Sequence, residues 1–313
     1  MRLLVVGKLN GQLSVAVKMA MNTGAKVSHV ETTEAATNAL RAGQGADLMM
    51  VDYALDIAGL THSFGRRRAL DDCSFTVPAG AVTALVGRNG SGKSTLVKLL
   101  CRFYDPERGA ILWDGVDLRE FEPAALRDRI TAVFQDFVRY EMTAGENIGL
   151  GDLVHLSDDG RIRAAAQRAG IDHELAHLPV GYRTALTRIY VSESDRDDPS
   201  TGVVLSGGQW QRVAVARAFL RAQRDLTILD EPSAGLDAEA EYRIHTGLRA
   251  HRRDRTSVLI SHRLGAVRDA DRILVLDEGE LVEDGTHASL LADGGVYATL
   301  YSLQAAGYAE AVG

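Results

Sequence analysis

The first 55 residues alternate between short apolar runs and segments whose apolar residues recur at helical spacing. Apolar runs at residues 3–6, 26–30 and 46–52 predict three strands. Residues 12–22 and 32–43 predict two helices, because the helical periodicity of each stops next to a glycine. The order β-α-β-α-β favours a parallel sheet, with Asp52 at the carboxyl end of its third strand.

The pattern changes near residue 60, where a basic turn opens a second strand-rich stretch. Three strands and two helices are too few to bury a good core alone, so we place a domain boundary near residues 56–60. The predicted parts are a segment at 1–57, a larger domain at 58–308 and a tail at 309–313. Within the larger domain, residues 192–202 form a linker-like stretch that is acidic and poor in apolar groups.

An apolar strand at residues 81–86 leads into a glycine-rich loop, and a helical run follows at residues 96–100. The loop fits G-x-x-x-x-G-K-[ST], in which glycines let backbone N–H groups surround an anion and the helix N-terminus adds positive potential. Lys93 is predicted to reach the β- and γ-phosphates of a nucleotide, and the Ser94 hydroxyl to bind Mg²⁺. The predicted nucleotide-binding residues of this loop are Gly87, Asn89, Gly90, Ser91, Gly92, Lys93, Ser94 and Thr95.

Two acids, Asp230 and Glu231, follow a second apolar run at residues 226–229. Open α/β sheets bind their ligands at the carboxyl ends of strands. Asp230 can hold Mg²⁺ through water, and Glu231 is placed to polarise an attacking water as a general base. A single acid after a strand is commonly only an acidic turn, but two acids downstream of a phosphate loop favour catalysis.

A further motif precedes a helical run at residues 210–220 and consists of Leu205, Ser206, Gly207, Gly208 and Gln209. This LSGGQ resembles the signature of ATP-binding cassette proteins, the ATPase subunits of ABC transporters. Other residues match the family in the same order. Gln135 resembles the Q-loop glutamine, Ser233 and Asp237 belong to a D-loop-like run, His262 resembles the switch histidine, and Phe64 lies where the family places an adenine-stacking aromatic. The resemblance covers about residues 58–306.

The resemblance implies a P-loop ATPase of the ABC type, with a RecA-like core, an antiparallel β subdomain and a helical signature subdomain. It implies ATP and Mg²⁺ as cofactors, with Ser94, Gln135 and Asp230 at the metal and Glu231, His262 and Gln135 in catalysis. A second cassette, identical or different, would supply its signature residues to this chain's ATP. ATP would then hold two cassettes together, and hydrolysis would release them.

Residues 271–279, 283–287 and 295–304 resemble the exporter branch of this family. This implies a subunit that powers export from the cytoplasmic face of the plasma membrane. In that branch the cassette normally follows six membrane-spanning helices, and no run of about 18 apolar residues occurs in this chain. We therefore expect the transmembrane domains to be a partner of the chain.

Residues 1–55 resemble the first half of a response-regulator receiver, most closely the atypical receiver of a flagellar sigma-54 activator. Asp52 falls at the position of the phospho-acceptor, but the place of the receiver's acidic pair reads Gly-Lys-Leu-Asn at residues 7–10. We interpret Asp52 as a strand-end acid. The abrupt join favours an engineered or chimeric fusion, or a sequence artefact, over a natural truncated fusion.

Composition limits the alternatives. The net charge of the 313-residue chain is −7, which argues against nucleic acid as a partner. The chain has only two cysteines, which indicates a reducing compartment. A soluble ABC ATPase outside a transporter, a receiver–ATPase signalling fusion and a binding-only module remain as rivals. Three positions also keep a structural alternative: Phe64 as a core aromatic, Trp210 as a packing residue and Cys101 as a small buried apolar residue.

Overall fold

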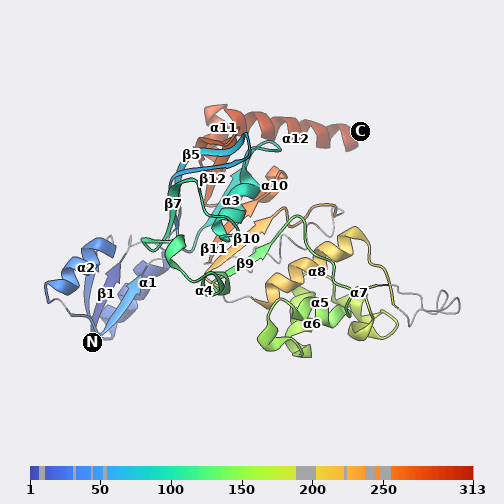
Figure 1. The fold of residues 1–313 in the computed structure, drawn as a ribbon, viewed down its shortest axis with the longest axis horizontal. Helices are drawn as coiled ribbons and strands as arrows, with labels where there is room; N and C mark the ends of the chain where they lie inside the picture. Colours follow the sequence, from blue (N-terminus) through green and yellow to red (C-terminus); the bar gives the residue numbers. More distant parts are fainter. Residues whose placement is uncertain are drawn as a thin grey trace. The chain divides into compact units, whose positions relative to one another are not determined.

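The computed structural model describes residues 1–6, 11–30, 33–43, 45–51, 55–187, 202–221, 224–236, 241, 244, 246 and 255–312 (Figure 1). The chain divides into two compact units. The first comprises Met1–Asp128, Asp254–Val258 and His262–Gly313, and the second comprises Arg129–Arg253 and Leu259–Ser261.

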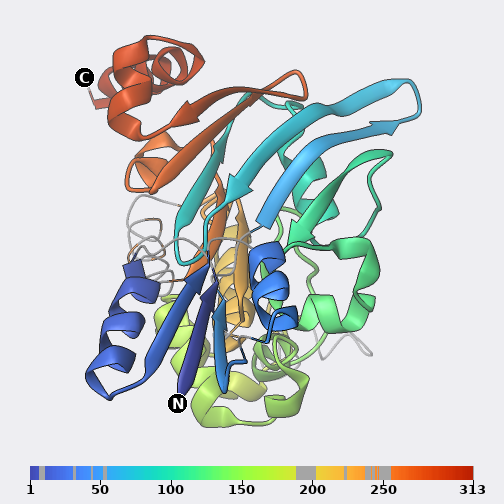
Figure 2. The same ribbon diagram turned by 90° about the vertical axis from the view of Figure 1, so that its left-hand side faces the viewer.

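The N-terminal segment forms its own three-stranded parallel sheet, drawn in blue in Figure 2. Its elements are β1 (Arg2–Val6), α1 (Gly11–Asn22), β2 (Lys26–Val30), α2 (Thr33–Arg41) and β3 (Leu48–Val51), with the strand order β2-β1-β3. Alternate residues of β1 are buried in two separate clusters, one with Val17 of α1 and one with Ala36 of α2. The β-α-β-α-β order predicted from the sequence is confirmed, while Asp52 and residues 7–10 lie outside the described residues.

An antiparallel sheet of four strands follows, in the order β5-β4-β7-β8. It consists of β4 (Leu55–Phe64), β5 (Arg67–Val77), β7 (Arg108–Trp113) and β8 (Val116–Asp117). Because β4 begins at Leu55, residues 55–57 already pair with β5 and β7, although the sequence pattern places the boundary after residue 57. The domain division itself stays a prediction.

A six-stranded sheet has the order β13-β12-β6-β11-β10-β9. The strands are β6 (Val82–Val86), β9 (Ile130–Val133), β10 (Leu226–Asp230), β11 (Thr256–Ile260), β12 (Arg272–Asp277) and β13 (Glu280–Gly285). Every residue of β10 and β11 is buried, as expected for central strands of a sheet that is covered on both faces. The phosphate-loop strand and the acid-pair strand predicted from the sequence are β6 and β10.

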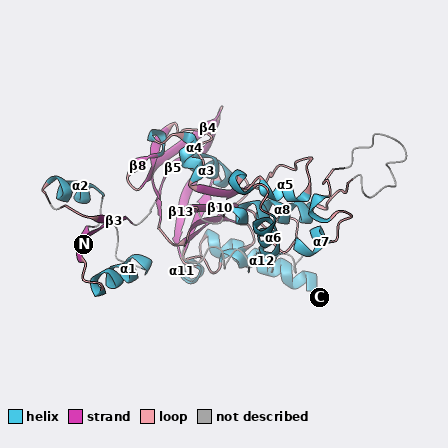
Figure 3. Cartoon of the chain, turned by 90° about the horizontal axis from the view of Figure 1, so that it is seen from below, coloured by secondary structure: helices cyan, strands magenta, loops and turns pink. Residues whose placement is uncertain are grey.

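Helices occupy both units (Figure 3). In the first unit they are α3 (Lys93–Leu100), η1 (Leu118–Glu120), α4 (Pro123–Asp128), α10 (Leu264–Val267), α11 (His287–Asp293) and α12 (Val296–Val312). In the second unit they are α5 (Ala144–Gly149), η2 (Leu153–His155), α6 (Asp159–Arg168), α7 (Asp172–Ala176), η3 (Gly181–Arg183) and α8 (Gly207–Leu220). None of the helices in the described ranges combines the length and apolar character that a bilayer crossing requires.

Both cysteines are buried, as the sequence predicts for Cys101. Cys73 is 1% exposed and its thiol donates to the carbonyl oxygen of Gly279 at 3.0 Å. Burial raises the pKa of the Cys73 thiol and raises the pKa of Cys101 to about 12. Both side chains therefore stay as neutral thiols near neutral pH.

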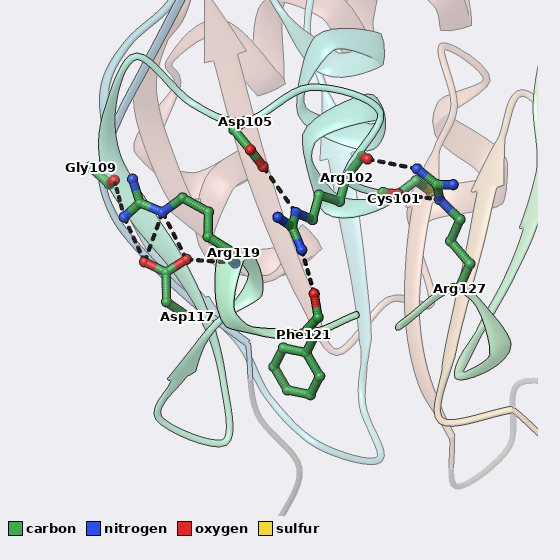
Figure 4. A network of polar contacts seen from close by, with 8 residues as sticks. All are labelled: Cys101, Arg102, Asp105, Gly109, Asp117, Arg119, Phe121 and Arg127. Atoms are coloured by element: carbon green, nitrogen blue, oxygen red, sulfur yellow. Dashed lines mark hydrogen bonds and ion pairs between the residues drawn. The ribbon is translucent and has the colours of Figure 1, made fainter. Parts of the chain in front are cut away.

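A group of arginines joins the C-terminal end of α3 to the segment that follows it (Figure 4). Arg127 of α4 donates from Nε to the carbonyl of Cys101 at 3.3 Å and from Nη2 to that of Arg102 at 2.9 Å. Arg102 in turn donates to the Asp105 carboxylate at 3.0 Å and to the carbonyl of Phe121 at 2.5 Å. Since the last carbonyls of a helix lack partners within the helix, these bonds fix the end of α3.

We expect Arg127→Met to lower the free energy of unfolding by about 1 kcal/mol, because two carbonyls lose a charged donor while the apolar stem is kept. Urea denaturation followed by circular dichroism measures the change. Arg127→Lys is the control, since an ammonium lacks the planar fork that bridges two carbonyls and should recover only part of the loss. Equal stability of Arg127→Met and the wild-type protein would show that Arg127 contributes nothing to this helix end.

Candidate functional site

The glycine-rich loop connects β6 to α3 in the first unit, as predicted. Gly87 has φ +152° and Gly92 has φ +104°, in the backbone region that favours glycine. A Cβ atom added to Gly87 would collide with the backbone oxygen of Leu276, and a Cβ atom added to Gly92 would collide with the backbone oxygen of Ala69. Both glycines are therefore required by their surroundings, and the close packing holds the loop in one curled shape.

Lys93 is the first residue of α3, directly after this loop, and is only 8% exposed. Its Nζ donates to the carbonyl oxygens of Gly87 and Arg88, both at 2.8 Å, and to the Ser91 hydroxyl at 3.2 Å. A buried cation surrounded by loop backbone at the start of a helix concentrates positive potential there. Ser94 is exposed and Thr95 is half-buried, so the first turn of α3 is accessible beside this charge.

The acid pair ends β10 in the second unit. Asp230 is 4% exposed, whereas Glu231 is half-buried and has φ +50°, an unusual value for a residue with a side chain. The Glu231 backbone N–H donates to Ile260 of β11 at 2.9 Å. Residues with strained backbone are common at functional positions. Here the change in backbone direction leaves Asp230 as the last residue of the strand and Glu231 as the first residue of the turn.

Gln211 is a site residue that the sequence argument missed. It is 2% exposed on α8, and its Nε2 donates to the backbone oxygens of Glu231 at 3.3 Å and Pro232 at 3.0 Å. These bonds connect the signature helix to the acid-pair turn. The sequence feature that could have identified Gln211 is its position among the apolar residues of a predicted helix.

The LSGGQ residues form the N-terminal end of α8. Ser206 is the N-cap, and it forms a capping box with Gln209: the Ser206 N–H donates to Gln209 Oε1 at 2.8 Å, and the Gln209 N–H donates to Ser206 Oγ at 3.2 Å. Leu205 is buried, while Ser206 and Gly207 are exposed. The cap therefore presents an ordered, accessible end of a 14-residue helix.

The D-loop-like run lies against the signature within the same unit. A Cβ atom at Gly208 would be 3.1 Å from the Leu236 side chain, so the two segments pack closely. Ser233 is 2% exposed, and Asp237 lies outside the described residues. Trp210 is 3% exposed, which supports its packing alternative. The linker-like stretch at 192–202 falls outside the described residues except for Gly202.

Gln135 is exposed in a turn after β9, and the segment that follows is fixed by Arg217 of α8. Arg217 donates at 2.6 Å to the backbone oxygen of Val138 and to both oxygens of Asn147, and its guanidinium lies 4.9 Å from the centre of the Tyr140 ring. All its acceptors are neutral, and burial lowers the pKa of Arg217 to about 10.

Asn147, which is fully buried, completes this arrangement. Its Nδ2 donates to the backbone oxygens of Tyr140, Met142 and Thr143 at 3.0, 3.2 and 3.1 Å. The Arg217–Asn147 pair thus joins α5, α8 and residues 138–143, and it sets the position of the chain just after Gln135.

His262 and Phe64 lie in the first unit. His262 is exposed after β11, and its backbone oxygen accepts a hydrogen bond from Gln304 of α12 at 2.9 Å. Phe64 ends β4 and is 47% exposed, so its core alternative is wrong. Its ring contacts His62 and Tyr104, with centroid distances of 5.0 and 5.6 Å. An exposed ring held edge-on by two others leaves a face available to a ligand.

A family model described as "ABC transporter" matches residues 70–234, which include the phosphate loop, LSGGQ and the acid pair. The chain belongs to the ABC transporter family. It has the ABC ATPase fold, and the fold class predicted from the sequence is confirmed.

Two named relatives and a solved structure are similar to this chain. An "ATP-dependent lipid A-core flippase" of Bordetella avium is 43% identical over 238 residues, 76% of this chain and 38% of the relative. An "Uncharacterized ABC transporter ATP-binding protein YknV" of Bacillus subtilis is 41% identical over 239 residues, 76% of this chain and 37% of the relative. A solved "bacterial Atm1-family ABC exporter with ATP bound" has a TM-score of 0.71 and 38% identity, over 81% of this chain and 42% of that chain. The chain spans about two-fifths of the length of these relatives.

Proposed function

We propose that this protein is the ATP-binding and ATP-hydrolysing subunit of an ABC exporter. The observation that carries the proposal is the phosphate loop, in which required glycines surround the buried Lys93 amine at the start of α3. A loop of this shape and charge suits the phosphate chain of a nucleotide. The family match, the flippase name of one relative and the exporter title of the solved structure support the transport role.

The donor chemistry fits Mg²⁺, which prefers oxygen ligands. In our proposal the Ser94 hydroxyl, the Asp230 carboxylate and the Gln135 amide oxygen hold the ion, which would neutralise charge on the phosphates. Glu231 accepts a proton from the attacking water as general base. Lys93 and the loop N–H groups stabilise negative charge on the transferred phosphoryl group, and His262 and Gln135 complete the site from their strand ends.

A second cassette completes each site in this proposal. Ser206, Gly207 and Gly208 act on the nucleotide held by the partner, for which the exposed, capped N-terminus of α8 is suited. Two copies would therefore bind ATP jointly and separate after hydrolysis. The further partners are transmembrane domains, and the chain would work at the cytoplasmic face of a membrane.

For the N-terminal segment, we propose a receiver-like half-domain in which Asp52 is a strand-end acid. The parallel order β2-β1-β3 supports this resemblance. The division into residues 1–57, 58–308 and 309–313 belongs to the same proposal. Neither the receiver-like assignment nor this division changes the residues that we assign to the ATP site.

The proposed function is tested by measuring phosphate release from MgATP against protein concentration. We expect the rate per molecule to rise with concentration, because each site needs residues from two copies. Lys93→Ala is the control, and its affinity for ATP should fall by roughly tenfold or more because the phosphates lose a buried cation. A rate per molecule that is independent of concentration would contradict the shared site, and undiminished release by Lys93→Ala would contradict the assignment of the loop.

A further inference from the structure

Three consecutive arginines follow β4: Arg66 lies in the turn, and Arg67 and Arg68 are the first residues of β5. Phe64 and Arg67 are directly opposite in the antiparallel pairing of these strands. Arg67 is therefore fixed beside the residue that the family resemblance places against adenine. Neither the sequence motifs nor the family match, which begins at residue 70, assigns a role to Arg67.

Arg67 also lies against the phosphate loop. Its Nη2 donates to the backbone oxygen of Gly90 at 3.3 Å, and a Cβ atom added at Gly90 would be only 2.6 Å from that nitrogen. The guanidinium thus occupies the space that the absent side chain of Gly90 leaves open. This contact joins the start of β5 to the loop within one compact unit.

The charges of the three arginines differ in how they are neutralised. Arg68 donates to the Asp71 carboxylate at 2.7 Å, and this hydrogen bond raises the pKa of Arg68. Arg67 has no carboxylate partner among the described residues, and the group that accepts its hydrogen bond is a neutral carbonyl. The side chain of Arg66 is exposed and forms no hydrogen bond or ion pair within the described ranges.

We propose that Arg67 contacts the phosphate chain of the bound nucleotide and is a nucleotide-binding residue of this site. The inference rests on the proposed function, since it assumes that a nucleoside polyphosphate occupies the loop. A guanidinium presents several donors in one plane and stays charged, so it can exchange the carbonyl of Gly90 for phosphate oxygens. Because Arg67 is exposed, we expect a moderate contribution that salt reduces.

Titration of the full chain with MgADP tests the proposal, since ADP carries two phosphates and is not hydrolysed. We expect Arg67→Ala to raise the dissociation constant about fivefold to tenfold at low salt. Arg67→Lys should recover part of the affinity, because it keeps the charge. Arg66→Ala is the matched control, removing the same charge one residue away, and it should stay within about twofold of the wild-type protein.

Salt separates a direct role from a structural one. If Arg67 contacts phosphate, the difference between wild-type and Arg67→Ala affinities should shrink as NaCl is raised from about 50 to 500 mM. A difference that does not depend on salt and is not recovered by Arg67→Lys would overturn the proposal and leave Arg67 as an anchor of the loop. Equal effects of Arg67→Ala and Arg66→Ala would also overturn it.

The same titration distinguishes failure of the inference from failure of the proposed function. If wild-type protein binds MgADP, Lys93→Ala weakens binding and Arg67→Ala does not, the nucleotide site stands and the role of Arg67 is wrong. If wild-type protein does not bind MgADP although circular dichroism shows it to be folded, both are wrong.

Discussion

Glu231→Gln is expected to reduce phosphate release by roughly a hundredfold or more while leaving ATP binding intact. The amide keeps the size of the side chain but cannot accept a proton from water at neutral pH. ATP-dependent dimers should therefore accumulate, because the bridging phosphate is not removed. Single-turnover phosphate release measures the loss, and size-exclusion chromatography with MgATP detects the dimer.

The chain provides a matched control in Glu278. Like Glu231, Glu278 follows an aspartate at the end of a strand and has a positive φ, +48° against +50°. It follows β12 directly, and it lies outside the phosphate loop, the signature and the acid pair. We expect Glu278→Gln to leave turnover within about twofold, which separates the loss of a catalytic base from a general effect of removing a strand-end charge. Undiminished phosphate release by Glu231→Gln would disprove the general-base assignment.

Arg217→Ala is expected to lower the free energy of unfolding by about 3 kcal/mol. The substitution leaves both oxygens of Asn147, in a partly buried place, and the carbonyl of the exposed Val138 without their charged donor. Buried acceptors that lose a partner keep the cost of desolvation without the compensating bond. Chemical denaturation followed by tryptophan fluorescence suits this test, because Trp210 lies on the same helix.

Arg183→Ala is the control for this measurement. Arg183 is an exposed arginine of the same unit, and its side chain has no hydrogen bond or ion pair within the described ranges. We expect its replacement to change the free energy of unfolding by less than about 0.5 kcal/mol. If the two variants have the same stability, the Arg217–Asn147 arrangement is not what holds α8 to residues 138–143.

The parts of the site that the sequence predicted are those whose chemistry is local. Gly87 to Lys93 indicate their proposed role within seven consecutive residues, because curled backbone needs glycine and a phosphate chain needs a cation. Ser206 and Gln209 likewise have the spacing of a capping box, and the structure forms it. The strands β6 and β10 were predictable since short apolar runs ended at these motifs.

Contacts between distant segments could not be predicted in this way. Arg217 reaches Val138 across 79 positions, and Gln304 reaches the backbone of His262 across 42. Nothing in the neighbouring sequence of either residue identifies a backbone carbonyl as its partner. The exposure of Phe64 was undecided for the same reason, because an aromatic at the end of a strand fits either a core or a ligand until the opposite strand is placed.

The two inert thiols give the protein a practical property. Maleimide reagents are attacked by thiolates, and burial keeps both Cys73 and Cys101 protonated and covered. A cysteine introduced at an exposed position such as Val154, which is 86% exposed, would then be the single site of labelling without removal of any native residue. Spin labels attached there would report the distance between two copies directly, with and without nucleotide, in the otherwise unaltered chain.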